Sequence, residues 1–184
     1  MITDGTMIDD ALGVDVRRAE ASEAGVLRDI TLAAYAEYAG LMKPAYWESY
    51  RQHIEDTHDD LGAGEQWVAL VAGTPVGTAL YYPPGTSFSD DVETAAMSPD
   101  CPEVRLLAVT PDRRGSGAGR ALMNACVSRA AEDGAPGLVL HTLEVMKAAR
   151  ALYASMGFER APELDFQPAR EWFVEGYRLS LPRP

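Results

Sequence analysis

The chain has 184 residues, of which 47% are hydrophobic and 24% are charged, and its formal net charge is −12 at pH 7. This length predicts one domain whose core needs neither disulfides nor metals, and the composition is that of a globular protein rather than a disordered one. The excess of negative charge argues against nucleic acid or an anionic membrane surface as a partner.

The N-terminal residues carry few apolar side chains and no targeting signal. Residues 1–13 mix Asp, Thr and Gly, so we expect a loose N-terminal extension before a domain of residues 14–184. No apolar run in the sequence reaches the roughly 18 residues of a membrane span, and a signal peptide would need a basic and an apolar part. Cys101 and Cys126 lack a C-x-x-C spacing, which indicates no disulfide framework and no metal site. We therefore expect a cytoplasmic protein, and the excess of Arg over Lys suggests a bacterial source.

The first half of the chain predicts a strand, two helices and a hairpin. These elements are expected over residues 14–18, 19–39, 44–60, 66–72 and 76–82. Ser22 stands where the first helix needs an N-cap, and Pro44 stands in the first turn of the second. The second helix is also rich in aromatic residues.

The second half alternates strands and helices after a long connection. Residues 83–102 are rich in Pro, Ser, Asp and Gly, and we interpret this segment as a lid or binding loop. Strands and helices are then expected over 104–109, a stretch ending at Gly134, 137–142, 146–156, 158–160 and 173–181. This alternation predicts a single-domain α/β fold with a mixed central sheet and helices on both faces.

A glycine-rich turn separates the strand at 104–109 from the following helix. Residues 114–119 place glycine at alternate positions. Glycine lets a ligand approach the backbone, and the first N–H groups of a helix lack partners and carry a partial positive charge. The basic residues Arg113, Arg114 and Arg120 gather at the same place. A phosphate group would fit this turn.

Two familiar phosphate motifs do not match the turn. The loop of nucleoside triphosphatases ends in Gly-Lys-Ser/Thr, whereas this turn ends in Gly119-Arg120-Ala121. A dinucleotide fingerprint needs glycine where Arg120 stands. The spacing Arg-x-x-Gly-x-Gly, which begins at Arg114 behind the strand end Leu-Ala-Val-x-Pro, resembles instead the GNAT acetyltransferase superfamily.

A second segment carries the same resemblance. The residues from Ala149 to Phe158 resemble the GNAT pattern A-x-x-L-Y-x-x-x-G-F. The predicted order of elements also matches the GNAT fold from about residue 14 to residue 181. The resemblance implies that acetyl-coenzyme A is a co-substrate, that the turn wraps its pyrophosphate, and that a bulge at the strand end admits its pantetheine arm.

The resemblance assigns cofactor contacts to the strand end, the turn and the later helix. These residues are Leu107, Ala108, Val109, Arg114, Gly115, Ser116, Gly117, Ala118, Gly119, Arg120, Met146, Ala149 and Tyr153. At Met146 the chain departs from the family, which often has an asparagine there, so we keep this residue as an apolar contact.

Two residues are candidates for catalysis. The resemblance implies that the Tyr153 hydroxyl lies near the thioester sulfur, where a phenol could donate a proton to the leaving thiolate. Helix tyrosines also pack their rings in a core. Glu103 stands where some family members carry a glutamate base that deprotonates the amine. Strand alternation puts Glu103 and Arg105 on one face, so a structural ion pair is the alternative.

The sequence identifies the residues of the acceptor site less specifically than those of the cofactor site. His141 could line the acyl channel or relay a proton, but strand histidines more often pack or hydrogen-bond. Several aromatic residues could line the acceptor pocket or could equally belong to the core. They are Tyr35, Tyr38, Trp47, Tyr50, Tyr81, Tyr82 and Phe88. An aromatic wall with acidic neighbours would favour a cationic amine. His53 and His58 lie among acidic residues with no metal-ligand spacing.

The combined prediction is an N-acyltransferase that moves an acetyl group from acetyl-coenzyme A to a small-molecule amine or a peptide amine by direct attack. One alternative is a non-catalytic protein that binds acyl-coenzyme A as a sensor or scaffold. Another is an enzyme whose acceptor is a protein N-terminus or a lysine. The resemblance further suggests a homodimer.

Overall fold

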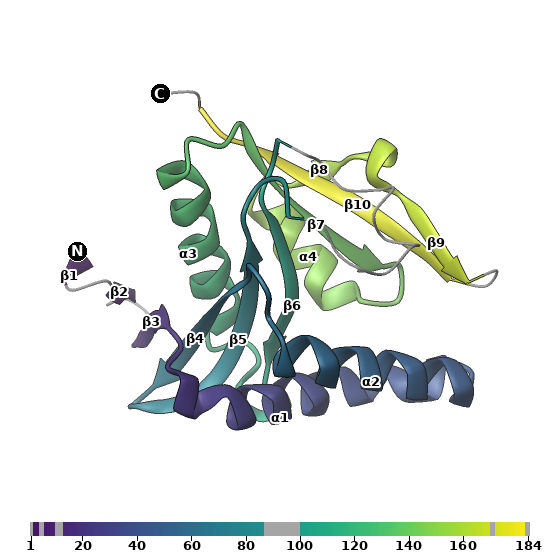
Figure 1. Ribbon diagram of the computed structural model, residues 1–184. Helices are drawn as coiled ribbons and strands as arrows, with labels where there is room; N and C mark the ends of the chain where they lie inside the picture. The colour runs from purple at the N-terminus through teal and green to yellow at the C-terminus, as the bar shows by residue number, and fades with distance from the viewer. Residues whose placement is uncertain (1, 4–5, 10–12, 87–99, 170–171, 183–184) are drawn as a thin grey trace. The chain divides into compact units, whose positions relative to one another are not determined.

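The computed structural model describes residues 2–3, 6–9, 13–86, 100–169 and 172–182. The chain packs as two compact units. Figure 1 labels their helices and strands. Unit 1 comprises Met1–Leu80 and Leu106–Ala125, and unit 2 comprises Tyr81–Arg105 and Cys126–Pro184. The strand β6 and the helix α3 each contribute residues to both units.

Unit 1 holds the N-terminal strands, the helix pair and the hairpin. Its elements are β1 (Ile2–Thr3), β2 (Thr6–Asp9), β3 (Val14–Arg18), η1 (Ala21–Glu23), α1 (Ala24–Tyr35), η2 (Ala36–Leu41), α2 (Pro44–Asp59), β4 (Glu65–Val71), most of β5 (Thr74–Tyr82), the end of β6 (Glu103–Val109), η4 (Pro111–Arg113) and the start of α3 (Ala118–Glu132). Among the described residues the strands follow the order β1-β2-β3-β4-β5-β6.

Two features of the N-terminal half differ from the prediction. Residues 1–13, expected to be loose, contribute β2, whose Met7 lies opposite Val16 of β3 in an antiparallel pair. The boundary of the domain at residue 14 stays a prediction. The expected helix at 19–39 is divided into η1, α1 and η2, and Glu23 rather than Ser22 satisfies an amide at its start. The Glu23 carboxylate accepts a hydrogen bond from the Glu20 amide at 2.8 Å.

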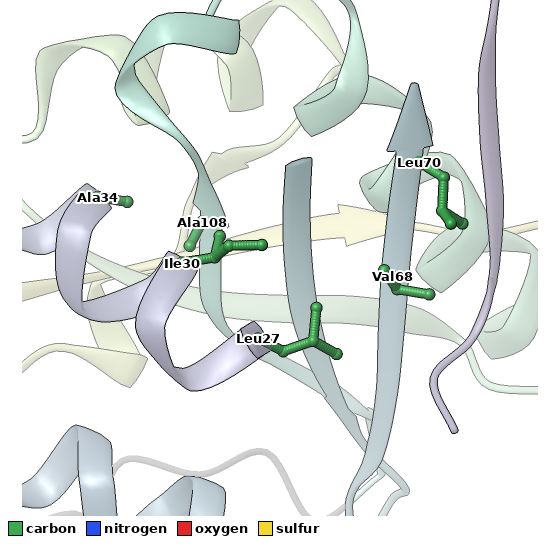
Figure 2. Packing of buried hydrophobic residues seen from close by; sticks show 6 residues of the cluster. All are labelled: Leu27, Ile30, Ala34, Val68, Leu70 and Ala108. Carbon is green, nitrogen blue, oxygen red and sulfur yellow. The ribbon is translucent and has the colours of Figure 1, made fainter. Parts of the chain in front are cut away.

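The core of unit 1 lies where α1 packs on the sheet (Figure 2). Buried side chains of α1, β4 and β6 meet there, namely Leu27, Ile30, Ala34, Val68, Leu70 and Ala108. The three α1 positions are spaced by three and four residues, which places them on one face of the helix. Burial of each large aliphatic side chain contributes about 1.5–3 kcal/mol. The helical spacing read from the sequence therefore identifies the buried face.

A chain of buried polar side chains crosses the same unit. His58 of α2 lies between Thr31 of α1 and Gln66 of β4, at 2.9 Å and 3.1 Å. Gln66 also donates to Thr78 of β5 at 3.3 Å, and Thr78 donates to the carbonyl of Trp67 at 2.9 Å. Hydrogen bonds of this kind offset the cost of burying polar groups. Both helices are thus tied to the sheet by directional contacts as well as apolar ones.

Unit 2 is built around the long strand β10 (Trp172–Ser180). Its other elements are the start of β6, the end of α3, β7 (Gly137–Leu143), α4 (Lys147–Ser155), β8 (Glu159–Arg160), η5 (Pro162–Leu164) and β9 (Phe166–Ala169). Within the described residues β10 pairs antiparallel with β7, β8 and β9. The start of β6 pairs in parallel with β7, with Glu103 opposite Val139. The sequence predicts every strand of this unit except β9.

Candidate functional site

The glycine turn of unit 1 has the backbone that its sequence requires. Gly115 and Gly117 have φ angles of +78° and +89°, in the left-handed region that L side chains rarely adopt. The helix α3 begins at Ala118, and the carbonyl of Gly117 accepts its first hydrogen bond, from the Ala121 amide at 2.9 Å. The amides of residues 117–120 therefore precede the hydrogen-bond ladder of α3, where a helix offers donors to an anion.

The basic side chain of the turn is already engaged within unit 1. Nη1 of Arg114 lies 2.6 Å from Oε2 of Glu37, and Nη2 donates to the carbonyl of Ala34 at 3.2 Å. The hydrogen bond to Arg114 holds the pKa of Glu37 below its ordinary value. Burial, together with a hydrogen bond to Glu37, raises the pKa of Tyr38 to about 12. Arg114 and Glu37 lie 77 positions apart in sequence, so no local pattern predicts their contact.

The strand end before the turn contains a backbone irregularity. Leu106 has a φ angle of +48°, which a bulky residue in a strand rarely adopts, and such irregularities re-aim the strand that follows. Ala108 is buried in the core of unit 1, whereas Leu107 and Val109 are half-buried. A ligand at this strand end would meet the backbone and the two half-buried side chains.

The second motif forms the C-terminal cap of α4 in unit 2. Gly157 has a φ angle of +86°, the Phe158 amide donates to the Tyr153 carbonyl at 3.0 Å, and the Gly157 amide donates to the Ala154 carbonyl at 3.1 Å. This pair of bonds is a Schellman motif, which is completed by an apolar contact between the flanking residues. Here the rings of Tyr153 and Phe158 make that contact, 5.8 Å apart. Tyr153 is buried, and the cap determines where its ring lies.

The start of α4 positions the residue that replaces the expected asparagine. Met146 precedes the helix and is buried, and Thr142 of β7 donates to its sulfur at 3.5 Å. Ala149, one turn along α4, is half-buried. Met146 thus packs as an apolar residue inside unit 2, and a contact of Met146 or Ala149 with a cofactor stays a prediction.

Glu103 and His141, which the sequence analysis treats separately, meet in unit 2. Oε1 of Glu103 lies 3.1 Å from Nδ1 of His141, and Nε2 of His141 lies 2.9 Å from the carbonyl of Leu164. A carbonyl only accepts, so Nε2 carries a proton. Burial acts to lower the pKa of His141, but the hydrogen bond and charge of Glu103, with the carbonyl, outweigh it and raise the pKa above its ordinary value. The pair therefore favours a protonated imidazole against a carboxylate.

The expected contact of Glu103 with Arg105 is present but longer. The Arg105 Nε lies 3.9 Å from Oε1 of Glu103, whose side chain is only 6% exposed. Two cationic groups thus face one buried carboxylate. This arrangement supports the ion-pair interpretation of Glu103 and leaves its role as a base a prediction.

Aromatic rings of α1, η2 and α2 form a cluster in unit 1. This aromatic cluster comprises Tyr35, Tyr38, Tyr46, Trp47 and Tyr50, all half-buried. Tyr50 is central, with ring centroids of Tyr35 and Trp47 at 5.9 Å and 6.5 Å. Such partly exposed rings can both pack on one another and meet a ligand.

The remaining aromatic candidates are placed differently. The Tyr81 side chain of unit 2 is buried, its hydroxyl donates to Asp133 at 2.6 Å, and the Arg129 guanidinium lies over its ring. Tyr82 is also buried. These contacts favour a packing role for Tyr81, and its contact with an acceptor stays a prediction. Phe88 lies outside the described residues.

Comparison with known proteins decides the family. A model of the acetyltransferase (GNAT) family matches residues 30–158. The chain belongs to the GNAT acetyltransferase family. The matched range runs from α1 through the glycine turn to Phe158, so it includes both sequence motifs, and the predicted family is confirmed.

Solved GNAT structures share the fold. The structure of histone acetyltransferase HPA2 and related acetyltransferase from Corynebacterium glutamicum is 21% identical, covers 92% of this chain and 97% of its own, and has a TM-score of 0.66. The structure of YncA from Salmonella typhimurium, with its cofactor acetyl-CoA, is 19% identical, with coverages of 92% and 95% and a TM-score of 0.60. The predicted mixed α/β fold is confirmed, and a cofactor of the expected kind is present in one such neighbour.

The sequence similarity to one curated acetyltransferase is confined to a short segment. The mycothiol acetyltransferase of Kocuria rhizophila is 43% identical over 63 residues, which are 34% of this chain and 21% of that protein. The match thus spans about a fifth of the length of this curated relative.

Two kinds of feature are absent from the described part of the chain. Within it, no group of three or more His, Cys, Asp or Glu side chains could hold a metal ion, and the buried residues Cys101 and Cys126 form no disulfide. None of the helices that the structure describes has the length and apolar character needed to span a bilayer.

Proposed function

We propose that this GNAT acetyltransferase moves an acetyl group from acetyl-coenzyme A to an amine acceptor by direct attack. Acetyl transfer from acetyl-coenzyme A to amines is the general reaction of the family. The observation that carries the proposal is the glycine turn, where Gly115 and Gly117 adopt left-handed φ angles directly before α3. Amides of residues 117–120 hold the pyrophosphate, because a helix N-terminus offers both hydrogen-bond donors and a partial positive charge.

The thioester is oriented by the end of β6. Residues 107–109 bind the pantetheine arm, and the Val109 amide polarises the thioester carbonyl. A donor aimed at the oxygen where negative charge develops stabilises the transition state. Leu106, with its φ angle of +48°, supports this step because it re-aims the strand just before these residues.

The bonds change in one addition and one elimination. The neutral amine nitrogen forms a bond to the acetyl carbon, the C–S bond breaks, and the attacking nitrogen loses a proton to a base. Tyr153 gives its hydroxyl proton to the departing thiolate. Its support is the Schellman cap, which fixes the ring position through Phe158 and so makes its hydroxyl a positioned donor.

Glu103 or a water molecule takes the proton of the amine. A Glu103→Gln variant separates these options, because loss of a base slows the reaction most where the amine is protonated and least at high pH. If Glu103 only pairs with His141, the variant lowers stability and leaves the shape of the pH–rate profile unchanged.

The aromatic cluster is the proposed acceptor wall, with Tyr35 and Trp47 as contacts. Its half-buried rings suit a cationic or aromatic amine. His141 and Tyr81 remain further proposed contacts. A mycothiol-type acceptor belongs in the panel because a relative with local similarity is a mycothiol acetyltransferase.

A binding experiment and an acceptor screen together test the proposal. Calorimetry with coenzyme A measures the first requirement, and release of free thiol from acetyl-coenzyme A measures turnover with polyamines, aromatic amines, amino sugars, peptides and a mycothiol-type amine. Binding without turnover on any amine would favour the sensor or scaffold, whereas exclusive reaction of peptides would favour a protein N-terminus or lysine. A cytoplasmic location, a bacterial source and a homodimer stay predictions.

A further inference from the structure

The side chain of Arg114 connects the glycine turn to the end of α1. Its guanidinium contacts two groups of unit 1 at once, the Glu37 carboxylate at 2.6 Å and the Ala34 carbonyl at 3.2 Å. Ala34 lies in the last turn of α1, where helix carbonyls have no intrahelical donor. A guanidinium suits this position because its planar fork donates in two directions and its charge complements the helix C-terminus.

The segment held by Arg114 is exposed or half-buried along its whole length. The helix η2 (Ala36–Leu41) is a 3₁₀ helix of six residues without a single buried residue. Runs of 3₁₀ helix longer than three or four residues are uncommon because their hydrogen bonds are poorly aligned. A segment with few buried contacts opens locally at low free energy. The order of η2 therefore depends on side-chain contacts such as that of Glu37 with Arg114.

The contact continues into the aromatic cluster. Tyr38 hydrogen-bonds to Glu37, and its ring meets the ring of Tyr35 edge-on at 6.1 Å. Tyr35 in turn contacts Tyr50 of α2 at 5.9 Å. An unbroken series of contacts thus runs from the glycine turn, through Arg114 and Glu37, to the rings of α1 and α2.

The charge of Arg114 is already balanced. Glu37 neutralises the guanidinium, and each group moves the pKa of the other toward its charged form. Binding of a phosphate by this side chain would have to break the ion pair. Among the backbone amides of the turn, that of Ala118 donates to Oγ of Ser116 at the longer distance of 3.4 Å, so an anion would displace a weaker contact there.

We propose that Arg114 is a positioning residue, whose contacts with Glu37 and Ala34 transmit occupation of the glycine turn by coenzyme A to η2 and the aromatic cluster. The inference rests on the proposed function, since it takes the turn as the coenzyme A site and the cluster as the acceptor wall. A ligand that immobilises the backbone of the turn restricts Arg114 and, through it, η2. Coenzyme A thereby orders the acceptor side of unit 1 before the amine binds.

Hydrogen exchange of the full chain tests this coupling. Amide exchange of a peptide that covers residues 36–42 is measured by mass spectrometry with and without saturating coenzyme A, after calorimetry has given the affinity of each variant. In the wild type we expect coenzyme A to slow this exchange by about tenfold, because a charge-assisted hydrogen bond stabilises the closed state by about that factor. In Arg114→Gln and in Glu37→Gln the slowing should vanish, while the affinity for coenzyme A falls by about 5-fold or less.

Matched variants distinguish positioning from a general loss of structure. Arg113→Gln removes the same charge from the neighbouring residue, whose guanidinium pairs with Asp112 at 3.5 Å, and should keep the slowing at η2. Arg114→Lys keeps the charge without the fork and should restore part of the effect. Thermal unfolding shows that each variant is folded.

The outcomes separate this inference from the proposed function. If the wild type binds coenzyme A but exchange at residues 36–42 does not change, or if Arg114→Gln keeps the change, the positioning role is wrong. If the wild type binds no coenzyme A, the proposed function fails and this inference falls with it.

Discussion

Nε2 of His58 lies 2.9 Å from Oγ1 of Thr31, so helix α2 is hydrogen-bonded to helix α1 through a buried imidazole. The other ring nitrogen, Nδ1, lies 3.1 Å from Nε2 of Gln66. An amide nitrogen only donates, so Nδ1 accepts and the ring is neutral with its proton on Nε2. Burial, with a smaller contribution from the charge of Arg28, lowers the pKa of His58 to about 4.

This neutral imidazole predicts a loss of stability in acid. Between pH 6.5 and about 4 the unfolded chain binds a proton at His58 that the folded chain does not. The free energy of unfolding should therefore fall by about 3 kcal/mol as the pH is lowered through this window. Urea unfolding at pH 7 and pH 4.5 measures the change. His58→Gln should flatten the dependence, while His53→Gln on the same helix should keep it. An equal slope in His58→Gln and the wild type would refute the assignment.

His141 predicts a pH dependence of the opposite sign. Its pKa is raised in the folded chain, so the stabilisation from its contact with Glu103 is complete below the ordinary histidine pKa and is lost as the pH rises through the folded value. Among the neighbouring charges, Glu103 and Asp165 favour the protonated ring and Arg105 opposes it. Unfolding between pH 6 and pH 9 should show the loss in the wild type. His141→Gln should remove it, and a wild-type stability that is constant over this range would contradict the ion pair.

Substitution of Gly117 should prevent cofactor binding. At a φ angle of +89° a side chain strains the backbone, and in Gly117→Val it would also stand beside the first amides of α3. We expect the affinity for coenzyme A to fall by about 100-fold, measured by calorimetry. Gly134→Val is the control, because it introduces similar strain at the other end of α3, where φ is +67°. An unchanged affinity in Gly117→Val would show that the turn is not the coenzyme A site.

Removal of the Tyr153 hydroxyl should slow turnover and spare binding. Tyr153→Phe keeps the ring contact with Phe158 and so the cap of α4, but it cannot protonate a thiolate. We expect kcat to fall by about 100-fold with little change in the affinity for coenzyme A. Tyr177→Phe, which removes another hydroxyl of unit 2, one that is bound to Glu175, is the control and should keep its rate. Equal rates of Tyr153→Phe and the wild type at every pH would exclude the acid role.

The features that the sequence predicts well are local ones. Gly157 directly follows Met156, and Phe158 lies five residues after its ring partner Tyr153, so a short window contains the whole cap. The alternation of β3 and the glycine spacing of the turn are local in the same sense. Such patterns determine where an element begins and ends because their hydrogen bonds close within a few residues.

The features that sequence reasoning misses depend on contacts between distant segments. The sequence alone does not place Glu37 beside Arg114, nor His141 within hydrogen-bond distance of Glu103, and the predicted roles of Arg114 and Glu103 stay predictions. The left-handed φ angle of Leu106 has no signal in the residue itself, since leucine is common in strands, and a bulge at this strand end was expected from the GNAT resemblance alone. Pairing of β2 with β3 was missed because few apolar residues mark that segment.

Tyr153 has two roles, because its ring completes the cap of α4 and its hydroxyl is the proposed acid. The contact with Phe158 that ends the helix would be needed for folding even in a protein that had lost its chemistry. Among duplicated descendants of an ancestral enzyme, the pattern of tyrosine, glycine and phenylalanine would therefore persist after activity had gone. The motif therefore indicates common ancestry and a shared fold. Only the hydroxyl, which the cap does not use, indicates whether a given descendant still catalyses the reaction.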